Sequence, residues 1–181
     1  MQPTPFDQNL VLTGYIGPGQ LALSRRIAER LRMPFLHFEA MLEARVDTPI
    51  DEFRLRFGET RLKALEGDVV AEISLARGSV LNISGHVLAQ VGVLERLQVN
   101  SIVVCLAASL DAVLRRLHIA MGARYHDPAE RERAIGMLRR EWAVRGRPGV
   151  IEIDSSEMSD NEVLEEAVAH WRQRSGVVDL G

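Results

Sequence analysis

Residues 9–24 read NLVLTGYIGPGQLALS, and this stretch decides the fold. It joins an apolar run of strand length to a glycine loop, and then to a segment in which Ile27, Ala28 and Leu31 continue a helical apolar face. A loop of this kind turns its backbone N–H groups inward and places a helix N-terminus behind them. The stretch therefore predicts a strand, a loop that can bind an anion, and a helix.

The same alternation of strand and helix continues outward along the chain. Further strand-sized apolar runs begin at Pro34, Ser79, Ser101 and Gly149. Helical periodicity covers residues 21–32, 40–46, 60–76, 87–97, 110–121, 128–144 and 161–174. Nearly continuous apolar strands that alternate with helices indicate a parallel sheet covered on both faces. We expect one doubly wound, three-layer α/β domain over residues 1–181, with flexible ends at 1–8 and 175–181.

The composition and net charge of the chain indicate which kinds of ligand and partner it can bind. The chain is 46% hydrophobic and 26% charged, which is typical of a folded globular domain, and its net charge of −3 gives no general attraction to nucleic acid or anionic lipid. Its arginines are interleaved with acidic residues, which favours a solvated helix surface over RNA binding. No apolar run has the length of a membrane span, and the N-terminus lacks the pattern of a signal peptide. We expect a cytoplasmic protein with a small-molecule ligand, without membrane or nucleic acid; a protein partner or a homo-oligomer stays open.

The topology leaves one place for that ligand. In open parallel sheets the crevice lies beyond the carboxyl ends of the strands, which here are followed by residues 14–19, 37–39 and 84–86. A divalent metal bound by His37, Glu39 and His86 is an alternative, but their spacing is not that of a metal motif, and we expect no metal. The lone Cys105 lies in an apolar run and is expected to be a buried, inert thiol.

The glycine loop departs from an active phosphate-binding loop. Gly14 and Gly19 have P-loop spacing, but Gln20 and Leu21 stand where an ammonium group would bind phosphate and a hydroxyl would hold Mg²⁺. Lys63 is the only lysine in the chain. Loss of one charged hydrogen bond to phosphate costs roughly 1.5–3 kcal/mol. The loop therefore predicts impaired ATP turnover.

The order of these features resembles the shikimate kinase family of small P-loop phosphotransferases, from about residue 9 to residue 170. The segments that carry the resemblance are GYIGPG (14–19), PFLHFEAMLEAR (34–45), FGETRLKALEGDVV (57–70), SVLNISGH (79–86), SIVVCLAASLDAVLRRL (101–117), GARYHDPAERERA (122–134) and VIEIDSSEMSDNEV (150–163). The resemblance implies a five-stranded P-loop NTPase fold, ATP with Mg²⁺ as cofactor, and a lid-like segment at 120–133.

The resemblance also implies two sets of site residues. The nucleotide or phosphate set is Gly14, Gly17, Gly19, Gln20, Arg116 and Arg124. The substrate-pocket set is His37, Glu39, Lys63, Gly85 and His86. A second substrate arginine corresponds to Arg139 or Arg140. Within these sets, Gln20, Leu21 and Ala22 replace the P-loop lysine and its hydroxyl partners, His37 and Glu39 replace aspartates, Lys63 replaces an arginine, and Ser84-Gly85-His86 replaces a glycine triplet.

These departures favour a shikimate-kinase-like protein that has lost efficient phosphotransfer and binds a nucleotide, a phosphate or a small polar metabolite. The alternative is an active ATP-dependent kinase of shikimate or a similar polyol. A second alternative is a non-catalytic scaffold or regulatory partner. No catalytic residue is assigned, because the departures fall on the positions that carry the chemistry.

Overall fold

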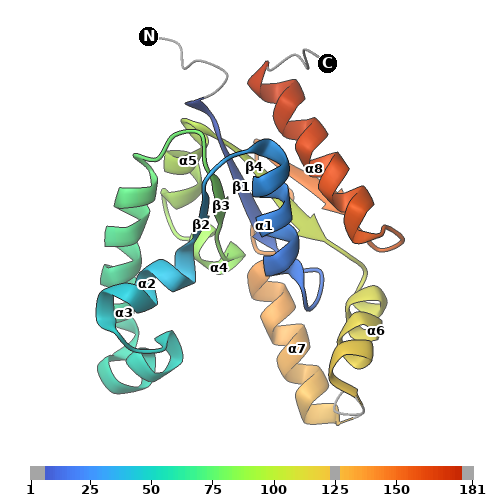
Figure 1. The fold of residues 1–181 in the computed structure, drawn as a ribbon. Helices are drawn as coiled ribbons and strands as arrows, with labels where there is room; N and C mark the ends of the chain where they lie inside the picture. Colours follow the sequence, from blue (N-terminus) through green and yellow to red (C-terminus); the bar gives the residue numbers. More distant parts are fainter. Residues whose placement is uncertain (1–6, 123–126, 177–181) are drawn as a thin grey trace.

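The computed structural model describes residues 7–122 and 127–176. Five parallel strands form one sheet in the order β2-β3-β1-β4-β5 (Figure 1). Their bounds are β1 Asn9–Gly14, β2 Phe35–His37, β3 Val80–Asn82, β4 Ser101–Ala107 and β5 Val150–Asp154. The central strand β1 pairs with β3 from Leu10 to Leu12 and with β4 along its whole length. The expected doubly wound parallel sheet is confirmed.

Helices cover both faces of the sheet because its central strands are apolar on both sides. Leu10 and Leu12 of β1 pack with α1 (Gln20–Leu31), α6 (Leu110–Met121), α7 (Pro128–Glu141) and α8 (Asp160–Ser175). Val11 between them belongs to a second core with α2 (Phe38–Val46), α3 (Ile50–Ile73), α4 (Gly85–Leu88) and α5 (Val93–Gln98). Alternate residues of one strand therefore serve opposite cores, as the strand period of two requires.

Two helices differ from the sequence-based expectation. The helix expected over 87–97 is two helices, α4 and α5, because Gly92 takes a left-handed conformation with φ 77° just before α5. The helix expected over 60–76 begins ten residues earlier, at Ile50, and bends at Gly58, where φ is 81° and ψ is 168°. The bend explains why a single helical period does not run through this segment.

The ends of the chain and the lid-like segment lie partly outside the described residues. On either side of residues 123–126, α6 ends at Met121 and α7 begins at Pro128, so the lid function of 120–133 stays a prediction. Within the segments expected to be flexible, the Trp171 indole N–H donates to the Gln8 carbonyl at 3.2 Å, and Ser175 is buried. Gln8 and Ser175 therefore contact the rest of the domain, and the flexibility of the ends stays a prediction.

Among the helices of the described residues, none is long and apolar enough to cross a membrane. Cys105, on β4, is completely buried, and burial raises the pKa of its thiol to about 12. Both properties are those expected of an inert core thiol.

Candidate ligand-binding site

Two adjoining cavities open at the carboxyl ends of the strands. The first has a volume of about 330 Å³ and is lined by the glycine loop together with the ends of β2 and β3. The second, of about 630 Å³, lies between α2, α3, α4 and α7. Both cavities share Phe38, Glu39, Ser84, Met137 and Glu141. They are therefore two parts of one crevice, at the edge of the sheet where the sequence predicts it.

Glycine is required at two positions of the loop. Gly14 has a φ of 84°, and a Cβ there would lie 2.1 Å from the carbonyl oxygen of Leu106. Gly17 has a φ of 134°, and a Cβ would lie 3.2 Å from the Cβ of Arg116. A side chain at either position would strain the backbone; at Gly14 it would also collide with β4, and at Gly17 it would make a tight contact with Arg116 on α6. The close approach of the loop to its neighbours thus fixes its curved shape.

Gln20 bridges the loop from within. Its Oε1 accepts a hydrogen bond from the backbone N–H of Ile16 at 2.8 Å, and its Nε2 donates to the carbonyl oxygen of Gly14 at 2.8 Å. One loop N–H that could bind a phosphate oxygen is therefore already satisfied by the protein itself. The loop holds its shape through a neutral side chain, without an ammonium group.

Arg116 supports the loop from α6. Its guanidinium donates to the carbonyl oxygen of Ile16 at 2.9 Å, to the hydroxyl of Ser155 at 3.0 Å and to the carbonyl oxygen of Ser155. These contacts tie the loop to the end of β5 and leave the guanidinium engaged by the protein. Arg124, the other arginine expected near a nucleotide, lies outside the described residues.

His37 and Glu39 follow β2 and line the first cavity, as expected from the end of that strand. The pKa of His37 is lowered from 6.5, chiefly because burial disfavours the charged imidazolium; Glu39 opposes this shift and Arg25 adds to it. His37 is therefore a neutral imidazole at pH 7. Glu39 is exposed to solvent and reaches both cavities.

The turn after β3 is joined to the end of α7. Ser84 caps α4 by accepting from the N–H of His86, and the Glu141 carboxylate accepts from the Ser84 hydroxyl at 2.8 Å and from the Gly85 N–H at 3.1 Å. A Cβ on Gly85 would lie 1.9 Å from the carbonyl oxygen of Glu141. Glu141 is a site residue that the sequence reasoning missed, because only tertiary packing brings the end of one helix to the start of another.

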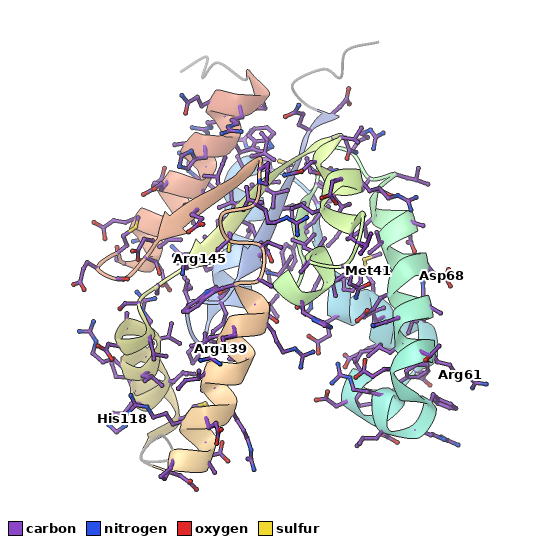
Figure 2. All side chains as sticks on the ribbon, turned by 180° about the vertical axis from the view of Figure 1, so that it is seen from behind. Met41, Arg61, Asp68, His118, Arg139 and Arg145 are labelled. Carbon is purple, nitrogen blue, oxygen red and sulfur yellow. The ribbon has the colours of Figure 1, made fainter. Side chains whose placement is uncertain are left out.

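The remaining expected substrate residues separate into two groups. His86 and Arg140 line the second cavity, together with Arg54 and Arg133. Lys63 is exposed on α3, and Arg139 is exposed on α7 (Figure 2); neither lines either cavity. The structure therefore favours Arg140 over Arg139 as a pocket residue and does not bring Lys63 to the crevice.

The metal alternative finds no support in the geometry. Within residues 7–122 and 127–176, no group of three or more His, Cys, Asp or Glu side chains is placed to hold a metal ion. His37 lines only the first cavity and His86 only the second.

Two arginines of the clusters noted in the sequence form ion pairs on the protein surface. Arg145 (Figure 2) pairs with Glu152 at 3.0 Å, and Arg147 pairs with Glu95 at 2.9 Å.

The charge of the first cavity is unusual for a phosphate site. Among the described residues that line it there is no lysine or arginine, whereas Glu39 and Glu141 contribute carboxylates. Gln20 and Leu21 supply neither the ammonium group nor the hydroxyl that Mg²⁺ with a triphosphate uses in a P-loop. The residues present therefore do not fit Mg²⁺-ATP in the manner of an active P-loop.

A glycine loop between the first strand and the first helix, above a crevice at the carboxyl ends of a parallel sheet, is the arrangement of the P-loop kinase fold, and the family model that matches this chain places it in that class. Residues 17–172 match the family model described as shikimate kinase. The chain belongs to the shikimate kinase family, as the resemblance predicted.

Individual relatives are distant. The shikimate kinase of Thermoanaerobacter pseudethanolicus is 24% identical over 170 residues, which is 93% of this chain and 99% of that protein. The shikimate kinase of Thermodesulfovibrio yellowstonii is 26% identical over 110 residues, 61% of this chain and 64% of that protein, so this match spans less than two thirds of the relative. The crystallised shikimate kinase from Acinetobacter baumannii in complex with shikimate has a TM-score of 0.74 at 20% identity and covers 96% of each chain. At this identity the structural match shows the shared fold.

Proposed function

We propose that this protein is a small-molecule-binding member of the shikimate kinase family in which the P-loop no longer supports efficient phosphoryl transfer. The observation that carries the proposal is the position of Gln20, whose carboxamide bridges Ile16 and Gly14 inside the loop. A phosphate group that entered the loop would meet an occupied N–H at Ile16 and no cationic side chain among the described lining residues. The ligand that the crevice favours is therefore a small polar metabolite.

The electrostatics of the crevice support the same conclusion. Glu39 and Glu141 line the region shared by both cavities, and a triphosphate would have to approach these two carboxylates. Like charges in a partly enclosed site repel more strongly than in bulk water, because the effective dielectric constant is lower. A nucleotide should therefore bind weakly in this crevice.

Calorimetric titration of the full chain with ATP, with and without Mg²⁺, tests this proposal. We expect no heat of binding below the millimolar range, and no ADP formation when shikimate is added. The double variant Gln20→Lys with Leu21→Ser restores the ammonium and hydroxyl, and should tighten ATP binding by about tenfold or more. Micromolar, Mg²⁺-dependent binding by the unaltered protein would overturn the proposal.

An active ATP-dependent small-molecule kinase is the second candidate, and membership of the family favours it directly. The family model describes a kinase, and the relatives that match nearly the whole chain are named shikimate kinases. This candidate predicts ATP-dependent phosphorylation of shikimate or a similar polyol, with a rate that falls when Gln20 is changed to Ala. A rate that does not respond to Gln20→Ala would count against it.

A further inference from the structure

The carboxylates that line the crevice outnumber the arginines that are not already paired with a carboxylate. In the second cavity, Arg54 is paired with Asp51 and with Glu59, at 3.0 Å each. Arg133 is paired with Glu130 at 2.8 Å. Two of the three arginines that line this cavity are thus neutralised by carboxylates on their own helices.

Among the described residues, the glutamates that line the crevice have neutral hydrogen-bond donors or no partner, and none has a cationic one. Glu141 is held by a hydroxyl and a backbone N–H, which are neutral donors. Glu66 is buried and accepts from the amide of Gln90 at 2.7 Å, which is also neutral. The Glu39 carboxylate makes no hydrogen bond or ion pair with the residues that the structure describes. Among the described lining residues, three carboxylates therefore remain against the single unpaired guanidinium of Arg140.

The rest of the lining is that of a site for a hydroxylated ring. Ser84, His86 and Asn82 offer hydrogen-bonding groups around the two cavities. Phe38, Leu42 and Val87 provide an apolar wall against which carbon atoms can pack. A combined space of this size accommodates one sugar-sized ring with a substituent.

We propose that the crevice selects a hydroxylated amine of the size of one sugar ring, such as an amino sugar, with its ammonium group held between Glu39 and Glu141. This inference rests on the proposed function, in which the crevice binds a small polar metabolite, and it assigns the charge of that metabolite. Glu141 is the anchored carboxylate, because Ser84 and Gly85 fix its position before a ligand arrives. Glu39 is exposed, lines both cavities and makes no hydrogen bond or ion pair with the described residues, so its carboxylate is free to turn toward the ammonium. At the position of that ammonium, the carboxylate of an acidic ligand of the same shape would be repelled by both anions.

Three probes of one ring size separate the charges: glucosamine, glucose and glucuronate, with shikimate as a fourth. Calorimetry on the full chain, at a mildly acidic pH that keeps the amine protonated, should show glucosamine bound about tenfold more tightly than glucose. Glucuronate and shikimate should show no binding at the same concentration. Equal affinity for glucosamine and glucose, or tighter binding of either acid, would overturn the inference while leaving a metabolite-binding crevice in place. Binding by none of the four would overturn the inference and the proposed function together.

Variants assign the effect to the two carboxylates. Glu39→Gln and Glu141→Gln should each weaken glucosamine binding by about tenfold and weaken glucose binding less, because each removes a charge and keeps the side-chain shape. Glu39 is exposed, so its variant remains informative if the loss of the Glu141 contacts impairs folding. Glu132→Gln is the matched control, since Glu132 is exposed on α7 and lines neither cavity. Equal losses in the control and in the two variants would contradict the assignment.

Discussion

The Nε2 of Gln20 lies 2.8 Å from the carbonyl oxygen of Gly14, so the first residue of α1 is hydrogen-bonded to the last residue of β1 across the loop that joins them. The Gln20 side chain also accepts a hydrogen bond from the Ile16 N–H, so its carboxamide links two backbone groups of the loop beside the first cavity. The curvature of the loop is thus maintained by the chain alone. A ligand that uses the Ile16 N–H must first displace this carboxamide.

Replacement of Gln20 by Ala should lower the free energy of unfolding by about 1–2 kcal/mol, because two partly buried hydrogen bonds are lost together. Urea denaturation followed by circular dichroism measures the change. Gln173→Ala is the control, since Gln173 is exposed on α8, and it should change stability by less than about 0.5 kcal/mol. Equal stability of the two variants would show that Gln20 does not hold the loop.

Arg116→Met keeps an aliphatic stem beside Gly17 and removes the guanidinium donors to Ile16 and Ser155. We expect a loss of about 2 kcal/mol in stability, together with faster amide hydrogen exchange in the loop. Arg115→Met is the matched control, because the Arg115 guanidinium lies on the exposed side of α6 at 3.8 Å from Glu157. An exposed ion pair of this kind contributes about 0–1 kcal/mol. Similar exchange rates in the two variants would contradict the bracing role of Arg116.

Gly85→Ala should destabilise the protein by about 3 kcal/mol or more, because its Cβ would lie 1.9 Å from the Glu141 carbonyl oxygen and force α4 away from α7. Thermal unfolding measures the effect. Gly67→Ala, on α3, should have the opposite effect on stability, since a Cβ there meets nothing within 4 Å. It should stabilise the helix by about 0.5–1 kcal/mol. A Gly85 variant as stable as the natural chain would mean that α4 and α7 do not pack as described.

Stability should decrease as the pH falls below 6.5, the ordinary pKa of a histidine, with a contribution from His37. Its folded-state pKa lies below that value, so the unfolded chain takes up the proton first, and protonation pulls the equilibrium toward unfolding. Above this pH both states are neutral at His37 and the effect vanishes. Melting temperatures measured across this range should fall less steeply for His37→Gln than for the natural chain. Parallel pH profiles would contradict the lowered pKa.

Cys105 should resist a thiol reagent in the native protein under mildly alkaline conditions, since the thiol is buried and its pKa is about 12. Complete reaction is expected in concentrated denaturant. Reaction of the native protein at the rate of a free thiol would show that β4 opens to solvent.

Much of the fold is readable from the sequence because its signals are local. The apolar runs at Asn9 and Ser101 have strand length, and Gly14 and Gly19 mark the loop between the first of these strands and α1. Helix boundaries with strong caps were also predictable, as at Asp127, whose carboxylate accepts from the Ala129 N–H at 2.8 Å. The division of 87–97 into two helices was not predictable, because Gly92 is compatible with one continuous helix as well as with a break. The packing of α5 on β4 decides between these two structures.

The candidate site was only partly predictable, because some of its residues are positioned by local sequence signals and others by tertiary packing. His37, Glu39 and His86 follow strand ends, so their approach to the crevice follows from topology. Glu141 and Arg140 reach the crevice from the last turn of α7, and no local pattern indicates which residues of that turn face inward. Lys63 was placed by resemblance alone, and in the structure it is exposed on α3 and lines neither cavity.

The hydrogen bond between Trp171 and Gln8 lies before the start of β1, whereas the crevice lies beyond its end. Figure 1 shows β1 running from the side where α8 ends to the side where the loop and α7 lie. The full length of the central strand therefore separates the region where residues 8 and 171 meet from the ligand-binding face. If the protein is attached to a sensor surface or to a fused reporter through the region where residues 8 and 171 meet, the crevice will face the solution.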